Sequence, residues 1–232
     1  MFEDLDMETV QGNAIAMSNV FEHFYDPVQV ISKIQQCAGN KYVFLNHPNF
    51  DFACRNDIPS VLNVEHTFYV ENAFVIALFA RFGYSCTDQH NYETHTVCFK
   101  FERTHAPTNI MPTNIASTVD VPRFFENKLR KVKAVNELID KYEKVYMWPS
   151  SPHTIELCTF GLKYKQLTGL LDNSPAKIST YSYGYNVKCY AFKEILASAP
   201  ETTCIVLGGS DCYLREIDVT GTRAKIVYMH EL

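Results

Sequence analysis

Residues 14 to 27 read "AIAMSNVFEHFYDP", and this stretch decides how the N-terminal half of the chain folds. The short apolar run at 14–20 is typical of a buried strand. Asp26 followed by Pro27 is the pattern of a helix start, because an aspartate side chain caps free N–H groups and proline fits the first helical position. The stretch therefore predicts a strand that ends in polar residues and leads directly into a helix.

The segments that follow extend this stretch into an α/β unit. The run at 27–38 has helical spacing, and "KYVFLN" (41–46) is a second short apolar strand. Two strands joined by a helix are expected to be parallel, with a right-handed crossover. A further helix is expected over 70–84, and β-rich runs at 84–92 and 94–103 predict an antiparallel hairpin.

The second half of the sequence predicts another α/β segment of its own. Residues 104–122 are rich in threonine, asparagine and proline, as linkers are, and a helical pattern follows to about residue 144. Strand and helix patterns then alternate as far as residue 229. We expect a first domain over 1–103, a linker and connecting helix over 104–143, and a second, small α/β domain over 144–232.

Composition limits the classes of function. The 232 residues carry a net charge of −5, and the densest basic run, "NKLRKVK" (127–133), has helical spacing and is expected to form a solvated face. Nucleic acid is therefore not an expected partner. No apolar run approaches the roughly 18 residues of a membrane span, so no membrane partner is expected.

The eight cysteines are scattered singly, and no C-x-x-C pair occurs. Several lie within apolar runs, where a reduced thiol packs as a small hydrophobic group. This usage is typical of a reducing compartment, and we expect a cytoplasmic protein. The sequence has no metal-ligand spacing, so no metal site is expected.

Four motifs in order carry a resemblance to a known family. They are "SNVFEHFYDP" (18–27), "FLNHPNF" (44–50), "LNVEHTFYV" (62–70) and "GLLDNSPAKISTYSYGYNVKCYAFKEIL" (169–196). In this order the chain resembles the S-adenosyl-L-methionine (SAM)-dependent C-methyltransferases that act on nucleotide-linked keto sugars. That family has an EH-x-x-DP motif after the fourth strand of a class I methyltransferase sheet and an EH-[ST] motif after the fifth. A C-terminal Rossmann-like domain follows, with a DN-x-P-x-K segment.

The resemblance implies an α/β fold made of a partial methyltransferase-type Rossmann sheet and a second, small Rossmann-like domain. It covers nearly the whole chain, but the sequence has no G-x-G and no cysteine-rich zinc module. The chain thus resembles the C-terminal two-thirds of such an enzyme, with an incomplete SAM site. The missing cofactor half would come from an N-terminal companion chain or from a homodimer. If "AIAMSNV" is then an edge strand, a partner or dimer mate is expected to cover it.

The resemblance also implies roles for two Glu–His pairs. C-methylation needs a base that removes a proton α to a keto group. His66, oriented by Glu65, is the candidate base, and Tyr69 would stabilise the enolate oxygen. Glu22 and His23 follow a strand end, where open α/β sheets bind ligands, and would contact the sugar. For Glu65 and His66, the alternative is a loop histidine hydrogen-bonded to the backbone. For Glu22 and His23, it is an acidic group that is favoured at a helix N-terminus.

Other candidates have weaker patterns. His47 and Asn49 are candidates for the same substrate cleft, and a purely structural role is equally compatible. Asp172 stands where Rossmann-like folds hold a ribose hydroxyl, although "DNSP" is also an ordinary turn that needs no ligand. The further assignments are Asn173 to the substrate and Ser18 and Asn19 to the cofactor.

Two functions from different classes remain open at this point. The retained Glu–His pairs favour a sugar methyltransferase that binds its nucleotide sugar and needs a separate cofactor half. The absence of a glycine-rich loop favours a non-catalytic binding or scaffold protein derived from a methyltransferase.

Overall fold

The computed structural model describes residues 9, 12–37, 39–58, 61–63, 65–92, 96–104, 106–107, 115–182, 184–209, 214–215 and 217–232. The chain divides into two compact units. The first unit comprises Met1–Asn56 with Glu65–Asp120, and the second comprises Asp57–Val64 with Val121–Leu232. The protein is mixed α/β, with one sheet in each unit.

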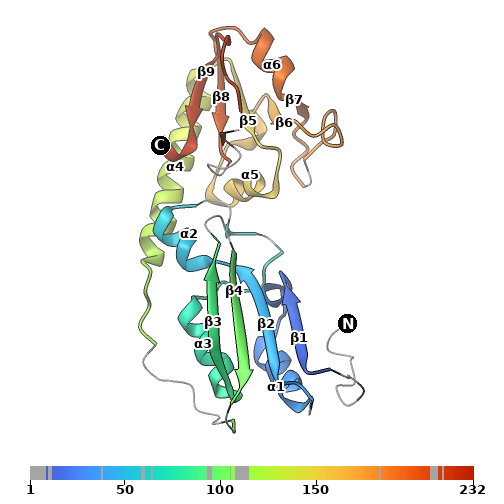
Figure 1. Ribbon diagram of the computed structural model, residues 1–232. Helices are drawn as coiled ribbons and strands as arrows, with labels where there is room; N and C mark the ends of the chain where they lie inside the picture. The colour runs from blue at the N-terminus through green and yellow to red at the C-terminus, as the bar shows by residue number, and fades with distance from the viewer. Residues whose placement is uncertain are drawn as a thin grey trace. The chain divides into compact units, whose positions relative to one another are not determined.

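The first unit is built on a four-stranded mixed sheet in the order β1-β2-β4-β3 (Figure 1). β1 and β2 are parallel, whereas β4 is antiparallel to both of its neighbours, β2 and β3. The predicted strand–helix–strand unit and the predicted hairpin are therefore both confirmed. The elements are β1 (Ala14–Ser18), α1 (Pro27–Gln36), β2 (Tyr42–Pro48), α2 (Phe50–Asn56), α3 (Asn72–Arg81), β3 (Tyr84–Asn91) and β4 (Thr96–Arg103).

The core of this unit lies between the sheet and two helices. Val43 and Leu45 of β2 share one face of the strand and pack in a single cluster with residues of α1 and α3. Phe79 of α3 stacks on Phe101 of β4 with the ring centroids 4.0 Å apart. α1 begins as the sequence predicts, because the Asp26 side chain accepts a hydrogen bond of 2.9 Å from the Gln29 N–H.

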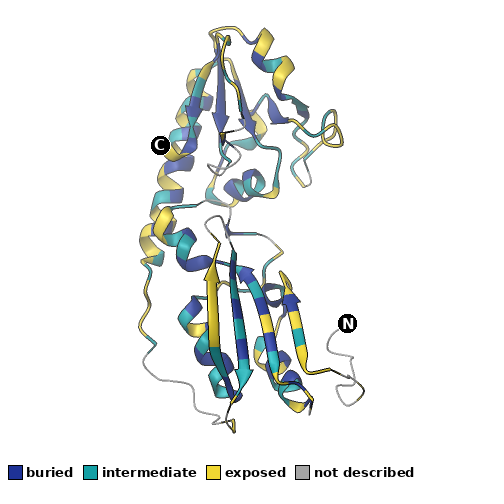
Figure 2. Cartoon of the chain, in the orientation of Figure 1, coloured by how far each residue is buried: buried dark blue, intermediate teal, exposed yellow. Residues whose placement is uncertain are grey.

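The prediction that the first strand is buried is wrong. Only Met17 of β1 is buried, and β1 pairs with β2 alone, so it forms one edge of the sheet (Figure 2). An apolar run reads as buried whether or not a neighbour lies on its outer side. The apolar pattern therefore identified the strand but not its exposure, whereas the position at the edge is the one that the resemblance implied.

The second unit contains a five-stranded parallel sheet in the order β7-β6-β5-β8-β9. With these strands numbered from the first in sequence, the order is 3-2-1-4-5, as in doubly wound α/β sheets. The elements are α4 (Val121–Lys141), β5 (Lys144–Trp148), α5 (Pro152–Glu156), β6 (Gly169–Asp172), β7 (Cys189–Ala191), α6 (Phe192–Ser198), β8 (Thr203–Leu207) and β9 (Lys225–Tyr228).

Helix α4, which we expected to connect two domains, packs within the second unit. Val132, Val135 and Ile139 are buried in the same cluster as Val145 and Met147 of β5. Among the described residues, no helix has the length and apolar character needed to cross a membrane. The seven cysteines within the described ranges are free thiols.

The prediction that the basic run of α4 forms a solvated face holds for Arg130 and Lys133, which are exposed, but is wrong for Lys128 and Lys131. Lys128 is 1% exposed and donates a hydrogen bond of 3.0 Å to Glu156 Oε1, and its Nζ lies 4.9 Å from the centroid of the Phe124 ring. Lys131 is 6% exposed and lies 2.6 Å from Asp57. Burial lowers the pKa of Lys128 and raises the pKa of Glu156 to about 7, and in each case the partner opposes the shift. Both lysines can be buried because each forms an ion pair with an acidic residue, Glu156 or Asp57. The spacing of residues in the sequence does not reveal such partners.

Replacing Lys128 by alanine should destabilise the protein strongly. The variant leaves the Glu156 carboxylate buried without its partner, and the free energy of unfolding should fall by about 3–5 kcal/mol. Urea denaturation measures this change. Lys163→Ala is the matched control, because its partner Asp140 is 56% exposed, and such an exposed pair contributes at most about 1 kcal/mol. Equal, small losses in both variants would contradict the role given to the buried pair.

Candidate functional site

The candidate site lies in the first unit, where the chain leaves β1. Asn19 adopts a left-handed conformation with φ 49°, and its N–H donates to the backbone oxygen and to Oδ1 of Asn46, at 3.1 and 2.9 Å. The 3-10 helix η2 (Phe21–His23) follows at once. Phe21 is buried in the core, and this anchor places Glu22 and His23 at the carboxyl edge of the parallel strands.

A second segment is tied to η2 through Thr67. The Thr67 N–H donates to the Glu22 carbonyl at 2.9 Å. Its hydroxyl oxygen lies 3.0 Å from the Glu22 carbonyl oxygen and 2.6 Å from that of Phe24. Residues 65–67 are therefore held against η2 by the backbone N–H and the hydroxyl of Thr67.

This contact brings the two Glu–His pairs together. His23 Nδ1 lies 2.9 Å from the Glu65 carbonyl oxygen, and the His23 and His66 rings meet edge to face with centroids 5.1 Å apart. One ligand atom each from Glu22, His23 and His66 lie within 4.8 Å of one another. The Tyr69 ring is 5.8 Å from that of His66 and 39% exposed. Glu65, by contrast, is an exposed residue.

The groups of the site differ in how far they are buried. Glu22 is only 4% exposed, and its Oε2 atom has no hydrogen-bond partner among the described residues. Burial raises the pKa of the Glu22 carboxyl group. Burial also lowers the pKa of His66, and the nearby His23 lowers it further. Such an arrangement can exchange protons with a ligand or hold a cation.

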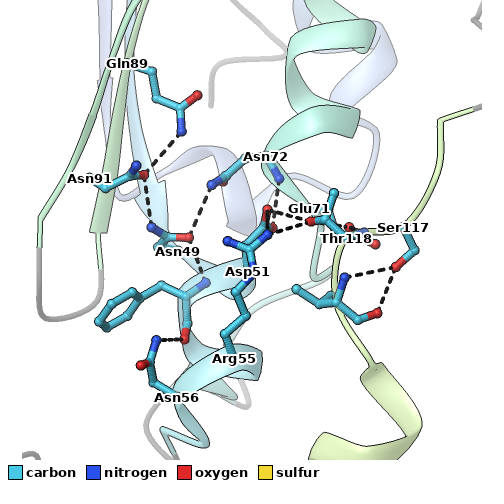
Figure 3. A network of polar contacts seen from close by, with 12 residues as sticks. Asn49, Asp51, Arg55, Asn56, Glu71, Asn72, Gln89, Asn91, Ser117 and Thr118 are labelled. Atoms are coloured by element: carbon cyan, nitrogen blue, oxygen red, sulfur yellow. Dashed lines mark hydrogen bonds and ion pairs between the residues drawn. The ribbon is translucent and has the colours of Figure 1, made fainter.

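The other predicted residues of the first unit lie in different surroundings. His47 is an inward-facing residue of β2, 2% exposed, with its ring stacked on Phe99 at 5.7 Å. Asn49 starts helix α2 by accepting the Phe52 N–H and contacts Asn72 and Asn91 through its amide. Figure 3 shows this side chain inside a polar network that joins α2, α3 and the end of β3.

In the second unit, Asp172 ends strand β6 and is 7% exposed. Its two carboxylate oxygens are engaged, Oδ1 by the Ser174 N–H at 2.9 Å and Oδ2 by Lys177 Nζ at 2.8 Å. Asn173 is exposed beside it. In Rossmann-like folds, an acidic residue that binds ribose occupies this position at a strand end. In this chain the contacts of Asp172 with Ser174 and Lys177 close a turn.

The residues assigned to the cofactor are Ser18 and Asn19, both exposed at the end of β1. The Asn19 N–H is already bonded to Asn46. No G-x-G occurs in the sequence to bring backbone N–H groups against a cofactor. The described residues alone therefore do not form a cradle for SAM.

Neither the known family models nor the curated proteins offer a match to this chain. Functional inference therefore depends on the residues and geometry described above.

Sequence reasoning missed Thr67 and Asn46 as the residues that hold the site together. Thr67 is the last residue of the "EHT" motif, and a hydroxyl directly after a Glu–His pair was the available signal. Asn46 ends an apolar strand, and its polar side chain at that point is the corresponding signal.

Replacing Thr67 by valine should loosen the candidate site. Valine keeps the shape but removes the two hydroxyl contacts to η2, so the free energy of unfolding should fall by about 1–3 kcal/mol. The Thr67→Val amide should also exchange its hydrogen faster than in the parent chain, which NMR measures. Thr87→Val is the control, because that hydroxyl makes a single long contact of 3.2 Å on the exposed strand β3. Unchanged stability and exchange in Thr67→Val would contradict the tie between the two segments.

His47 should make the protein sensitive to mild acid. Burial lowers its pKa from 6.5 to about 4, so the unfolded chain binds a proton in this range that the folded chain does not. Stability from this residue is complete above pH 6.5 and is lost as the pH falls toward 4, by about 3 kcal/mol in all. His47→Leu should flatten that part of the stability curve in urea titrations at stepped pH. The exposed His90→Leu should leave the curve as it is, and identical curves for all three proteins would exclude this account.

Proposed function

We propose that the chain is the substrate-binding half of a methyltransferase-type enzyme that acts on a nucleotide-linked keto sugar. The observation that supports this most is the meeting of two Glu–His pairs from distant segments at the carboxyl edge of β1 and β2. Open α/β sheets bind their ligands at this edge. The resemblance in sequence predicts the same two pairs at the reacting sugar.

The arrangement of strands supports the proposal at the level of the fold. The hypothesis makes β1 and β2 the fourth and fifth strands of a methyltransferase sheet, which are parallel neighbours. Such a sheet ends with its last strand inserted antiparallel beside the fifth, as β4 is inserted between β2 and β3. The doubly wound order of the second unit agrees with the Rossmann-like domain that the resemblance implies.

In the proposed site His66 is the base. It would accept the proton from the carbon next to the sugar carbonyl, leaving an enolate and an imidazolium. Glu22 supplies the buried carboxylate beside this imidazole. The Glu65 backbone carbonyl holds His23, and Tyr69, whose ring lies 5.8 Å from that of His66, would stabilise the enolate oxygen.

In this proposal the SAM site is incomplete in this chain, so the proposed chemistry of the chain ends at the enolate. Methyl transfer would require a glycine loop from an N-terminal companion chain, or a cofactor site built without that loop across a homodimer. The exposed edge strand β1 is where the remaining strands of a methyltransferase sheet would add.

A second candidate function is a non-catalytic binding protein of methyltransferase descent. The specific observation that favours it is the absence of a cofactor cradle around Ser18 and Asn19. In that case the first unit would still bind a sugar at its Glu–His pairs, without turnover.

Deuterium exchange tests the proposed proton transfer without the cofactor. The full chain is incubated in D₂O with a panel of nucleotide-linked keto sugars, and mass spectrometry follows label at the carbon next to the carbonyl. We expect exchange with at least one member, slowed about 100-fold or more in His66→Ala. His90→Ala, which alters an exposed histidine of β3, should exchange like the parent chain.

Equal exchange in His66→Ala and the parent would exclude His66 as the base. Saturable binding of a sugar nucleotide without any exchange would favour the non-catalytic alternative. Calorimetric titration with S-adenosylhomocysteine completes the test, because clear binding by the chain alone would contradict the incomplete cofactor site.

A further inference from the structure

The meeting of Glu22, His23 and His66 has a second chemical meaning, which does not depend on methyl transfer. Two imidazoles and one carboxylate, each offering one ligand atom, lie within 4.8 Å of one another. Ligands bound to one zinc ion at about 2.0–2.2 Å lie roughly 3–3.5 Å apart. Small side-chain rotations therefore close this triangle around an ion.

The tautomer of His23 suits a metal ligand. A backbone carbonyl can only accept a hydrogen bond, so His23 Nδ1, which lies 2.9 Å from the Glu65 oxygen, carries the proton. The lone pair is then on Nε2. Metal-binding histidines usually donate their other ring N–H to a carbonyl or carboxylate in this way, which fixes the ring and its tautomer.

The Glu22 carboxylate of the cluster is incompletely hydrogen-bonded among the described residues. Glu22 is 4% exposed, and Oε2 has no hydrogen-bond partner among the described residues. His66 Nδ1 is likewise buried without one. A buried carboxylate without compensation is costly, and a divalent cation held by the adjacent imidazoles would supply that compensation.

The two segments that carry the ligands are held together by contacts of Thr67 with backbone carbonyls. Thr67 bonds to the Glu22 and Phe24 carbonyls, so the His66 segment stays against η2. The site thus has a supporting shell made of Thr67 and the Glu65 carbonyl. This differs from an accidental surface cluster, whose side chains have no such restraint.

We propose that Glu22, His23 and His66 form a binding site for a first-row divalent cation of the zinc type. Two imidazole nitrogens with one carboxylate oxygen select zinc, cobalt, nickel or ferrous iron over magnesium and calcium, which prefer oxygen ligands alone. Three protein ligands leave an open position for water or a ligand. The bound ion takes the His66 lone pair, so metal binding and use of His66 as the base exclude each other.

Titration of the full chain with Co²⁺ tests the site, with a phosphine reductant keeping the cysteines reduced. Nitrogen and oxygen ligands give visible d–d bands, while thiolate ligands add charge-transfer bands in the near ultraviolet, so the spectrum separates this site from the cysteines. We expect one Co²⁺ site with d–d bands and no thiolate band, which Zn²⁺ displaces.

Three variants and a control decide the assignment. His23→Ala, His66→Ala and the isosteric Glu22→Gln should each weaken this site at least about 10-fold. His90→Ala should bind like the parent chain, and circular dichroism checks that each variant is folded. Unchanged binding in the variants, or a spectrum dominated by thiolate charge transfer, would overturn the proposal.

The metal result and the sugar result can be told apart. Co²⁺ binding without deuterium exchange would support the metal site and count against the proposed base. Exchange that persists in the apo chain and stops when Zn²⁺ is added would support both uses of the same residues. Exchange without any Co²⁺ site would leave the proposed function standing and overturn the metal site.

Discussion

The candidate site depends on the contact between Thr67 and the 3-10 helix η2. The backbone N–H and the hydroxyl of this residue contact the carbonyls of Glu22 and Phe24, at the end of the short helix. Residues 45 positions apart in sequence are joined there. The parallel pairing of β1 with β2 brings the two strand ends to one edge, and the Thr67 contact turns that proximity into a defined geometry.

Glu22 and Glu156, two of the buried carboxylates among the described residues, show how differently a folded chain can treat the same group. Glu156 in the second unit has Lys128 at 3.0 Å, so its desolvation is opposed by an ion pair. Each carboxylate keeps its Oε2 atom without a hydrogen-bond partner among the described residues, but the groups beside Glu22 in the first unit are two imidazoles. A structural role explains the first arrangement. The second is expected where a ligand, a proton or a cation completes the site.

Much of this architecture could be predicted from the sequence because its elements have strong local signals. The Asp26–Pro27 helix start and the β3–β4 hairpin were both expected from residue pattern and are present. The burial of Lys128 could not be predicted from spacing, because it depends on what lies opposite in the fold. The apolar pattern likewise did not show that β1 is exposed, although the resemblance implied an edge strand. Pattern shows which residues are apolar, and only the fold shows which neighbours are available to them.

The same limit applies to the candidate site. The positions of Glu22 and His23 after a strand followed from the apolar run before them, and the resemblance marked Glu65 and His66. The cluster of Glu22, His23 and His66 could not be predicted from the sequence. Metal-ligand motifs are recognised by short spacing, and these ligands come from two separate segments. His47, considered for the same cleft, faces the core instead because it has the same parity along β2 as Val43 and Leu45.

The most direct test of this account is NMR spectroscopy of the full chain with ¹⁵N-labelled histidine. The central claim is that His23 and His66 share one site, with His23 protonated on Nδ1. The account predicts a nuclear Overhauser effect between the two rings, whose centroids are 5.1 Å apart, and the ¹⁵N shifts of an Nδ1–H tautomer for His23. No contact between the rings, or a His23 that carries its proton on Nε2, would contradict it.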